Sequence, residues 1–145
     1  MKTPKIPVVV STDPSQLNIP IMVEWILGSY WGKWQDVERI VHSFKSSLFF
    51  GLYIPVNHGP QPQIGFCRVV TDHATFSSIT DMYVAEAFRG KGLGTHLLAE
   101  VVKHPSVGDT ICIIASRDAQ SWYKKFGWHR VGGDVMKRDP TPCQQ

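Results

Sequence analysis

The chain has 145 residues, 43% of them hydrophobic and 19% charged, which is enough for one compact domain with its own core and too apolar for a disordered protein. The formal net charge of +3 allows an anionic ligand but excludes a polybasic nucleic-acid-binding or membrane-binding arm. The three cysteines form no C-x-x-C pair, so neither a zinc site nor a disulfide framework is indicated, and a reducing cytoplasm is the expected setting.

Residues 1–145 are expected to form a single domain, with its core at about residues 6–138 and no membrane-spanning segment, because no apolar stretch approaches the roughly 20 residues of a membrane helix. The first half predicts a strand, two helices and two further strands, at residues 6–10, 21–34, 35–46, 48–54 and 63–71. In the second helix the apolar residues share one face, because they recur at i, i+3, i+4 and i+7: Val37, Ile40, Val41 and Phe44.

The second half alternates strands and helices. The expected elements are a strand at 77–84, a helix at 93–103, a strand at 110–115, a helix at 116–125 and a final hairpin of 129–131 with 135–137 around Gly132-Gly133. Pro105 is expected to stop the helix at 93–103. The order β-αα-βββ-α-β-α-ββ predicts a protein of the α/β (α+β) class in which helices pack on a mixed sheet.

A glycine-rich turn, Arg89-Gly90-Lys91-Gly92-Leu93-Gly94, joins the strand at 77–84 to the helix at 93–103. It places free backbone N–H groups and the positive end of a helix around one point, which predicts a cradle for a di- or polyphosphate. The alternative is a tight turn whose glycines serve geometry alone. The Walker pattern is missing, and the dinucleotide fingerprint fails because Thr95 stands at its last glycine, so ATP and NAD are poor candidates.

Two motifs resemble the signatures of the GCN5-related N-acetyltransferases (GNAT). Arg89-x-x-Gly92-x-Gly94 after the strand end Asp81-Met82-Tyr83-Val84 is similar to the acetyl-CoA signature of that family. Ser116-x-x-Ala119-x-x-x-Tyr123-x-x-x-Gly127-Trp128 is similar to its second signature, with Ser116 where Asn is common and Trp128 in place of Phe. The resemblance covers about residues 48–137 and implies the GNAT fold, in which the strands at 77–84 and 110–115 splay apart.

The resemblance implies acetyl-CoA as co-substrate and no metal. The pyrophosphate would be held by the backbone amides of Arg89, Gly90, Lys91, Gly92, Leu93, Gly94 and Thr95. The backbone of Met82, Tyr83 and Val84 would pair with pantetheine like an added strand, and an amide near Tyr83 or Val84 would polarise the thioester carbonyl. Ser116, Ala119 and Tyr123 of the second signature would complete the cofactor site.

Acetyl transfer to an amine also needs proton transfer. A lysine-like amine with a pKa near 10.4 must lose a proton before it attacks, and a tyrosine that stays protonated at pH 7 can protonate the departing thiolate. The resemblance implies that role for Tyr123, with aromatic packing beside Phe126 as the alternative. Asp81 is the candidate general base, and the alternatives are Glu86, Asp72, His73 or a relay of water molecules.

Tyr30 and Trp31, with Trp34 nearby, are expected to form the wall of the acceptor pocket or a hydrophobic plug between the first two helices. The function expected is a cytoplasmic N-acetyltransferase that moves the acetyl group of acetyl-CoA to a primary amine of a small molecule or protein, by direct attack in a ternary complex. The alternative is a non-catalytic CoA-binding sensor or regulatory module. No nucleic-acid partner is expected, because the basic residues form no stripe. The family resemblance also allows a homodimer.

Overall fold

The computed structural model describes residues 3–133 and 135–138. The chain divides into two compact units, residues 1–115 and residues 116–145. None of the helices in the described part of the chain has the length and apolar character needed to cross a membrane.

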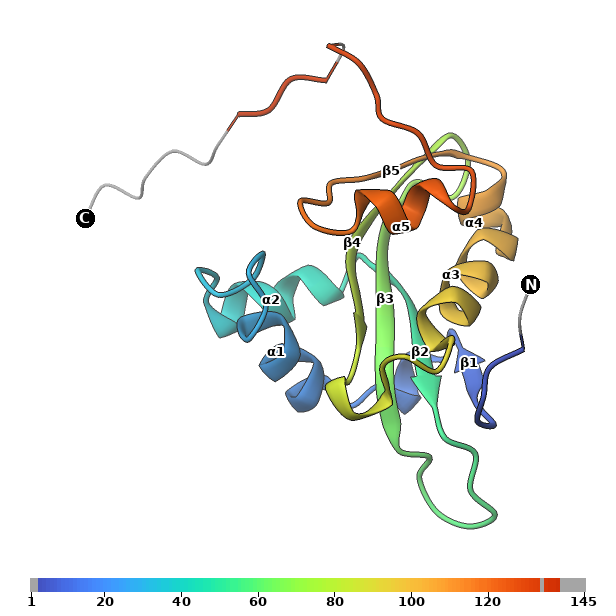
Figure 1. The fold of residues 1–145 in the computed structure, drawn as a ribbon. Coiled ribbons are helices and arrows are strands. Elements are labelled where there is room, and N and C mark those ends of the chain that lie inside the picture. Colours follow the sequence, from blue (N-terminus) through green and yellow to red (C-terminus); the bar gives the residue numbers. More distant parts are fainter. Residues whose placement is uncertain (1–2, 134, 139–145) are drawn as a thin grey trace. The chain divides into compact units, whose positions relative to one another are not determined.

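The unit of residues 1–115 is built on a mixed sheet whose strand order, within the described residues, is β1-β2-β3-β4-β5 (Figure 1). The strands are β1 (Val9–Ser11), β2 (Leu48–Tyr53), β3 (Gln63–Thr71), β4 (Phe76–Val84) and β5 (Ile111–Ile114). Neighbours from β1 to β4 are antiparallel, whereas β4 and β5 are parallel. The predicted α/β class with a mixed sheet is therefore confirmed.

Four helices accompany the sheet among the described residues of this unit: α1 (Ile19–Leu27), α2 (Val37–Phe44), α3 (Leu93–Lys103) and α4 (Pro105–Gly108). The side chain of Asn18 caps α1 by accepting from the N–H of Ile21, and Asp36 caps α2 by accepting from the N–H of Arg39. The short 3-10 turns η1 (Pro14–Gln16) and η2 (Glu86–Phe88) precede α1 and α3.

The first helix is shorter than expected. We predicted a helix over residues 21–34, but α1 ends at Leu27 with Gly28 as its C-cap. The chain then folds back over the helix end, so that a Cβ at Gly32 would overlap the carbonyl of Ile26. Only glycine fits there, and the segment between α1 and α2 becomes a tight connection instead of a third helical turn.

The two faces of the sheet carry different helices, since α1 and α2 lie on the opposite side from α3 and α4 (Figure 1). On the first face a core cluster joins the two helices to β2 and β3 through Met22, Val23, Ile26, Ile40, Phe44, Phe49 and Phe66. On the second face α3 buries its apolar stripe, including Leu93, Leu97, Leu98 and Val101. Each such side chain contributes about 1.5–3 kcal/mol when fully buried, so the sheet is a rigid support for the residues at its edge.

Proline explains two departures from prediction in this unit. The first strand, expected at residues 6–10, forms at Val9–Ser11, after Pro7, which has no N–H to donate to a ladder. The helix α3 ends at Lys103 as predicted, but Pro105 does not stop helical structure altogether. It starts the short α4, where its missing N–H is harmless and the side chain of His104 caps the turn.

The unit of residues 116–145 contains one helix among its described residues, α5 (Gln120–Lys124). It begins later than the predicted residue 116, because the Ser116 hydroxyl accepts from the N–H of Ala119 and holds the preceding turn. Gly127 then ends the segment with φ 87°.

The predicted final hairpin is wrong for the described residues of this segment. Residues 129–133 and 135–138 carry no strand. Their apolar side chains are open to solvent, with Val131 56% and Met136 95% exposed, so pairing would bury little apolar area. The Gly132-Gly133 pair also raises the entropy cost of fixing the backbone. Asp134, within the expected turn, lies outside the described residues.

Candidate active site

The edge of β4 opens partway along the strand. The parallel pairing with β5 joins Phe76–Ile79 to Ile111–Ile114 and stops there. Beyond it, residues 80–84 continue along β3, and among the described residues no strand pairs with their other edge. β4 therefore runs past the end of its pairing with β5, as the predicted splay of these two strands requires.

A β-bulge in β4 lies at the point where its pairing with β5 ends. Arg68 pairs with Asp81 and Val69 with Ile79, so Thr80 is the extra residue on β4. Its hydroxyl donates to the carbonyl of Arg68 at 3.1 Å. Bulges bend and twist the strand that carries them, and this one directly follows Ile79, the last residue of β4 that pairs with β5.

The strand register decides which main-chain groups face the open edge. The N–H of Ala85 donates to the carbonyl of Ile64 at 2.8 Å. Because hydrogen-bonded residues alternate along an antiparallel pair, Tyr83 also turns its main chain towards β3, while Met82 and Val84 turn theirs towards the open edge. Of the three residues predicted to pair with pantetheine, the register thus favours Met82 and Val84.

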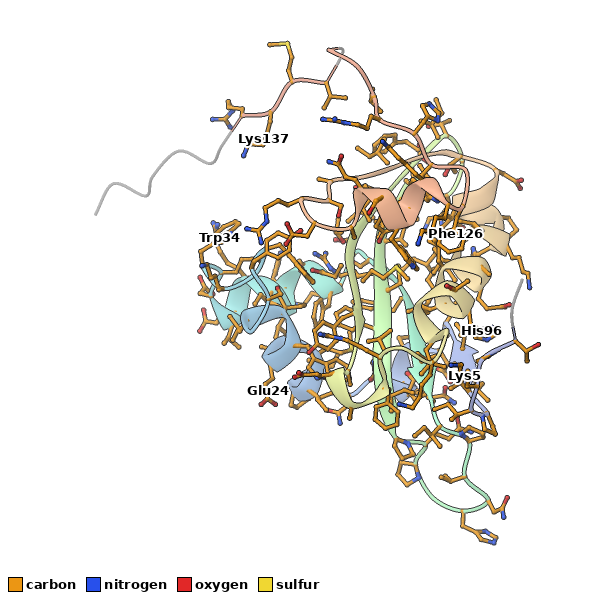
Figure 2. All side chains as sticks on the ribbon, in the orientation of Figure 1. Lys5, Glu24, Trp34, His96, Phe126 and Lys137 are labelled. Carbon is orange, nitrogen blue, oxygen red and sulfur yellow. The ribbon has the colours of Figure 1, made fainter. Side chains whose placement is uncertain are left out.

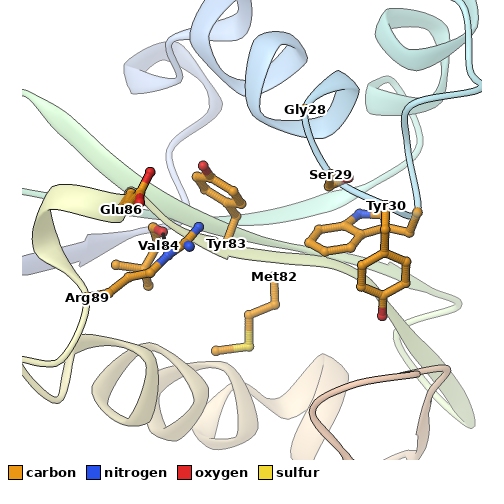
Figure 3. A pocket seen from close by; sticks show the side chains of 9 residues that line it. Gly28, Ser29, Tyr30, Met82, Tyr83, Val84, Glu86 and Arg89 are labelled. Carbon is orange, nitrogen blue, oxygen red and sulfur yellow. Dashed lines mark hydrogen bonds between the residues drawn. The ribbon is translucent and has the colours of Figure 1, made fainter.

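A pocket of about 490 Å³ lies beside this edge (Figure 3). The connection after α1 supplies one wall and the end of β4 with the following turn supplies the other; the lining residues are Gly28, Ser29, Tyr30, Trp31, Met82, Tyr83, Val84, Glu86 and Arg89. Tyr30 and Trp31, predicted to bind the acceptor, therefore share this pocket with four residues predicted to bind the cofactor. Trp34 is 71% exposed and is not part of the lining.

Arg89 closes one end of the pocket. Its Nε donates to the carbonyl of Val84 at 2.8 Å, and its guanidinium carbon lies 5.1 Å from the centre of the Tyr83 ring. Tyr83 also stacks against Trp25 of α1 at 5.1 Å between ring centres. Glu86, one of the alternative bases, lies on the same side of the pocket and is exposed (Figure 3). The mouth thus carries one positive and one negative side chain.

Asp81, the candidate general base, lies outside the pocket lining. The side chain is 2% exposed, and both of its oxygens already accept hydrogen bonds, one from Trp31 and one from Arg68. A general base needs an oxygen within hydrogen-bond reach of the proton that it removes. This environment favours a structural role for Asp81.

Asp72 and His73, two further candidate bases, lie in the turn before β4, at the other end of the strand from the pocket. The N–H of Phe76, with the hydroxyl of Thr75 and further turn N–H groups, holds the pKa of Asp72 well below its usual range. A carboxyl group with a lowered pKa is a weaker base. Nδ1 of His73 lies 2.8 Å from the hydroxyl oxygen of Ser106, within hydrogen-bond distance. Both residues are engaged in shaping the turn.

The glycine-rich turn has the conformation that a phosphate cradle needs. Gly90 and Gly92 have φ values of 76° and 78°, which side-chain-bearing residues rarely adopt. Gly92 is the N-cap of α3, and no side chain of the described residues caps the helix, so its first N–H groups have no side-chain acceptor there. Gly94 lies within the first turn of α3. Consecutive N–H groups in this arrangement bind anions.

The outer side of the turn is fixed by the N-terminal segment. The N–H of Lys5 donates to the carbonyl of Lys91 at 3.1 Å, and the Lys91 ammonium donates to the carbonyl of Ala87 at 3.2 Å. Figure 2 shows Lys5 on the same side of the unit as His96 in α3. The sequence did not point to Lys5, because a main-chain contact between two distant segments leaves no pattern of residue types in either of them.

Within the unit of residues 116–145, Tyr123 is buried, with 6% of its surface exposed. Its ring packs edge-on against Trp122 at 4.8 Å and against Trp128 at 5.7 Å between ring centres. Ser116 and Ala119 form the turn that precedes α5. The three residues of the second signature are thus brought together by one short helix and its cap.

More than half of the chain matches a known family. Residues 52–130 fit the sequence profile described as "Acetyltransferase (GNAT) domain". A Gibberella zeae protein named "Putative acetyltransferase FG08082" is 28% identical over 104 residues, which are 61% of this chain and 59% of that protein. "Uncharacterized N-acetyltransferase ycf52" of Gracilaria tenuistipitata var. liui is 33% identical over 67 residues, 45% of this chain and 37% of that protein. The chain thus spans less than two thirds of these relatives.

Solved structures share the fold over nearly the whole chain. A crystal structure from Xanthomonas campestris pv. campestris, described as belonging to the GNAT family, has a TM-score of 0.82 at 28% identity and covers 93% of this chain and 95% of that chain. A GNAT family protein from Streptococcus pneumoniae TIGR4 has a TM-score of 0.67 at 13% identity, with 95% and 98% covered. The second likeness concerns the fold alone.

Proposed function

Because the chain belongs to the GNAT acetyltransferase family, we propose that it is an N-acetyltransferase that moves an acetyl group from acetyl-CoA to a primary amine of a small molecule or protein. The observation that carries this proposal is the open edge of β4, which leads into the glycine-rich turn at the start of α3 and borders a pocket of about 490 Å³. The three features lie within residues 1–115.

The residues of the cradle and the edge fit the chemistry of acetyl-CoA. The backbone N–H groups of residues 89–95 would hold the pyrophosphate, helped by the positive end of α3. The main chain of Met82 and the N–H of Val84 would hold the pantetheine chain, since the register turns them towards the open edge and the Val84 carbonyl already accepts from Arg89. When bound, acetyl-CoA supplies an acetyl thioester, which is activated for transfer to a nitrogen nucleophile.

The pocket would orient the acceptor amine. Tyr30 and Trp31 offer apolar and aromatic surface, and the carboxylate of Glu86 at the mouth can attract an ammonium group. A proton must leave that ammonium before it can attack, and Glu86 can take it directly or through water. Asp81 is less suited to the task, because it is not part of the pocket lining and both its oxygens already accept hydrogen bonds.

We assign the general acid to Tyr123, as the resemblance implies. This role requires the two units to work as one acetyl-transfer domain over residues 1–145, and that single-domain organisation is part of the proposal. We also propose a cytoplasmic setting, with which the free thiols of Cys67 and Cys112 are consistent.

Turnover of acetyl-CoA in the presence of amines tests this function. The protein is incubated with acetyl-CoA and, one at a time, spermidine, L-lysine, tyramine, kanamycin, aniline or a lysine-containing peptide, and released thiol is measured. At least one amine is expected to raise thiol release well above the rate without amine, with an acetylated product of the expected mass. Acetyl-CoA binding without amine-dependent release would instead support the CoA-binding module, and no binding would contradict both.

The contact between the N-terminal segment and the glycine turn leads to a prediction. Lys5→Pro removes the N–H that holds the carbonyl of Lys91, so the turn should lose part of its fixed conformation. The KM for acetyl-CoA is expected to rise roughly five-fold, as for the loss of one neutral hydrogen bond. Lys5→Ala keeps the N–H and should stay within about two-fold of the parent. Equal KM values for the two variants would show that this contact does not support the cradle.

A further inference from the structure

Trp31, Asp81 and Arg68 meet beneath the pocket, although they belong to three different elements. The indole Nε1–H of Trp31 donates to Asp81 Oδ1 at 2.7 Å, and Nε–H of Arg68 donates to Asp81 Oδ2 at 2.6 Å. The side chain of Asp81 is 2% exposed and that of Arg68 is 14% exposed. The carboxylate therefore joins the two other side chains in a buried, charge-assisted arrangement.

The arrangement continues into α2 and the segment that follows it. Nη1 of Arg68 donates to the Ser47 hydroxyl at 3.1 Å, and that hydroxyl donates to the carbonyl of Ser43 at 2.9 Å. The guanidinium of Arg68 also lies 6.0 Å from the centre of the Phe44 ring. Arg68 is thus held from several sides, and it fixes Asp81 in turn.

Trp31 connects this buried group to the pocket wall. It ends the run Gly28–Trp31, which lines one side of the pocket, while Met82, next to Asp81, lines the other side. The hydrogen bond from Trp31 to Asp81 therefore ties one wall to the other. At the opposite end of the run, the Ser29 hydroxyl donates to the carbonyl of Ile26 and holds the wall to α1.

We infer that Asp81 is a positioning residue, which fixes the acceptor wall of the pocket through Trp31 and is itself held by Arg68. This inference rests on the proposed function of the pocket. The hydrogen bond from Trp31 to Asp81 keeps the wall at a set distance from Met82 and Val84, where the cofactor would lie. Loss of the Trp31–Asp81 hydrogen bond should therefore weaken acceptor binding and leave acetyl-CoA binding nearly unchanged.

Trp31→Phe tests the inference, because it removes the indole N–H and keeps an aromatic ring. Trp34→Phe is the matched control, since Trp34 lies three residues later, is 71% exposed and is outside the pocket lining. With the amine of the panel above that gives the highest kcat/KM, Trp31→Phe should raise the KM for the amine roughly ten-fold, as for the loss of one charge-assisted hydrogen bond. The KM for acetyl-CoA should stay within about two-fold in both variants.

A second measurement does not depend on turnover. In the parent protein, the indole N–H resonance that disappears in Trp31→Phe should exchange slowly with solvent, because its acceptor is a buried carboxylate. Fast exchange of this N–H would overturn the inference, whereas absence of turnover with slow exchange would contradict the proposed function alone.

Asp81→Asn separates positioning from base catalysis. A positioning role predicts that Asp81→Asn keeps the shape of the pH–rate profile. Loss of the acid limb of that profile in Asp81→Asn, with an unchanged KM for the amine in Trp31→Phe, would identify Asp81 as the base. If Asp81→Asn does not fold, the comparison of Trp31→Phe with Trp34→Phe decides alone.

Discussion

Tyr123→Phe is expected to lower kcat for amine acetylation by about two to four orders of magnitude, the range typical for loss of a general acid or base. The ring would keep its packing between Trp122 and Trp128, so the fold of this unit should not change. The dissociation constant for acetyl-CoA should stay within about two-fold of the parent. Stopped-flow or steady-state measurement of thiol release, with calorimetry for cofactor binding, checks both values.

Tyr53→Phe is the matched control for this experiment. Tyr53 is buried, 1% exposed, and its hydroxyl has no hydrogen-bond partner in the described structure. Burial raises its pKa to about 12, so the hydroxyl is protonated at neutral pH in the parent. Removal of this hydroxyl should leave kcat unchanged. If Tyr123→Phe also keeps the kcat of the parent, Tyr123 serves in aromatic packing and the general acid is another group.

Gly92→Ala is expected to weaken acetyl-CoA binding by roughly ten- to one-hundred-fold. A Cβ at Gly92 would meet no atom within 4 Å, so the effect comes from the backbone and not from a clash. Its φ of 78° costs an alanine about 1–2 kcal/mol, and relaxation of that strain turns the N–H groups at the start of α3 away from their common point. Titration calorimetry with acetyl-CoA measures the change.

Gly59→Ala controls for the strain itself. Gly59 has a similar φ of 80° and equally open surroundings, but it lies in the turn between β2 and β3, away from the glycine-rich turn. Both variants should lose comparable stability in thermal unfolding, while Gly59→Ala binds acetyl-CoA like the parent. Equal cofactor affinity in Gly92→Ala and the parent would show that this turn does not hold the pyrophosphate.

Local sequence patterns predicted the parts of the fold that depend on neighbouring residues. The strand at Gln63–Thr71 and the helix at Leu93–Lys103 have the predicted bounds, because alternation and helical periodicity are properties of a single segment. The positive φ of Gly90 and Gly92 likewise follows from residues that adopt it readily. The glycines and the start of the helix belong to the proposed cradle, which the family resemblance also emphasises.

The environment of Asp81 could not be predicted in the same way. The sequence predicted Asp81 as the general base, but Trp31 and Arg68 engage its carboxylate from 50 and 13 residues away. These contacts depend on the bulge at Thr80 and on where α1 ends, which are set by tertiary packing. The final hairpin was also predicted wrongly, because its formation depends on tertiary packing. Its turn signal was strong, but its apolar side chains are exposed.

We propose that the glycine-rich turn and the open edge of β4 together hold acetyl-CoA. A crystal structure of the protein with CoA tests it most directly. The pyrophosphate is expected within about 3 Å of backbone N–H groups of residues 89–95, with the pantetheine chain alongside Met82 and Val84. A pyrophosphate bound elsewhere, with these N–H groups facing solvent, would contradict it.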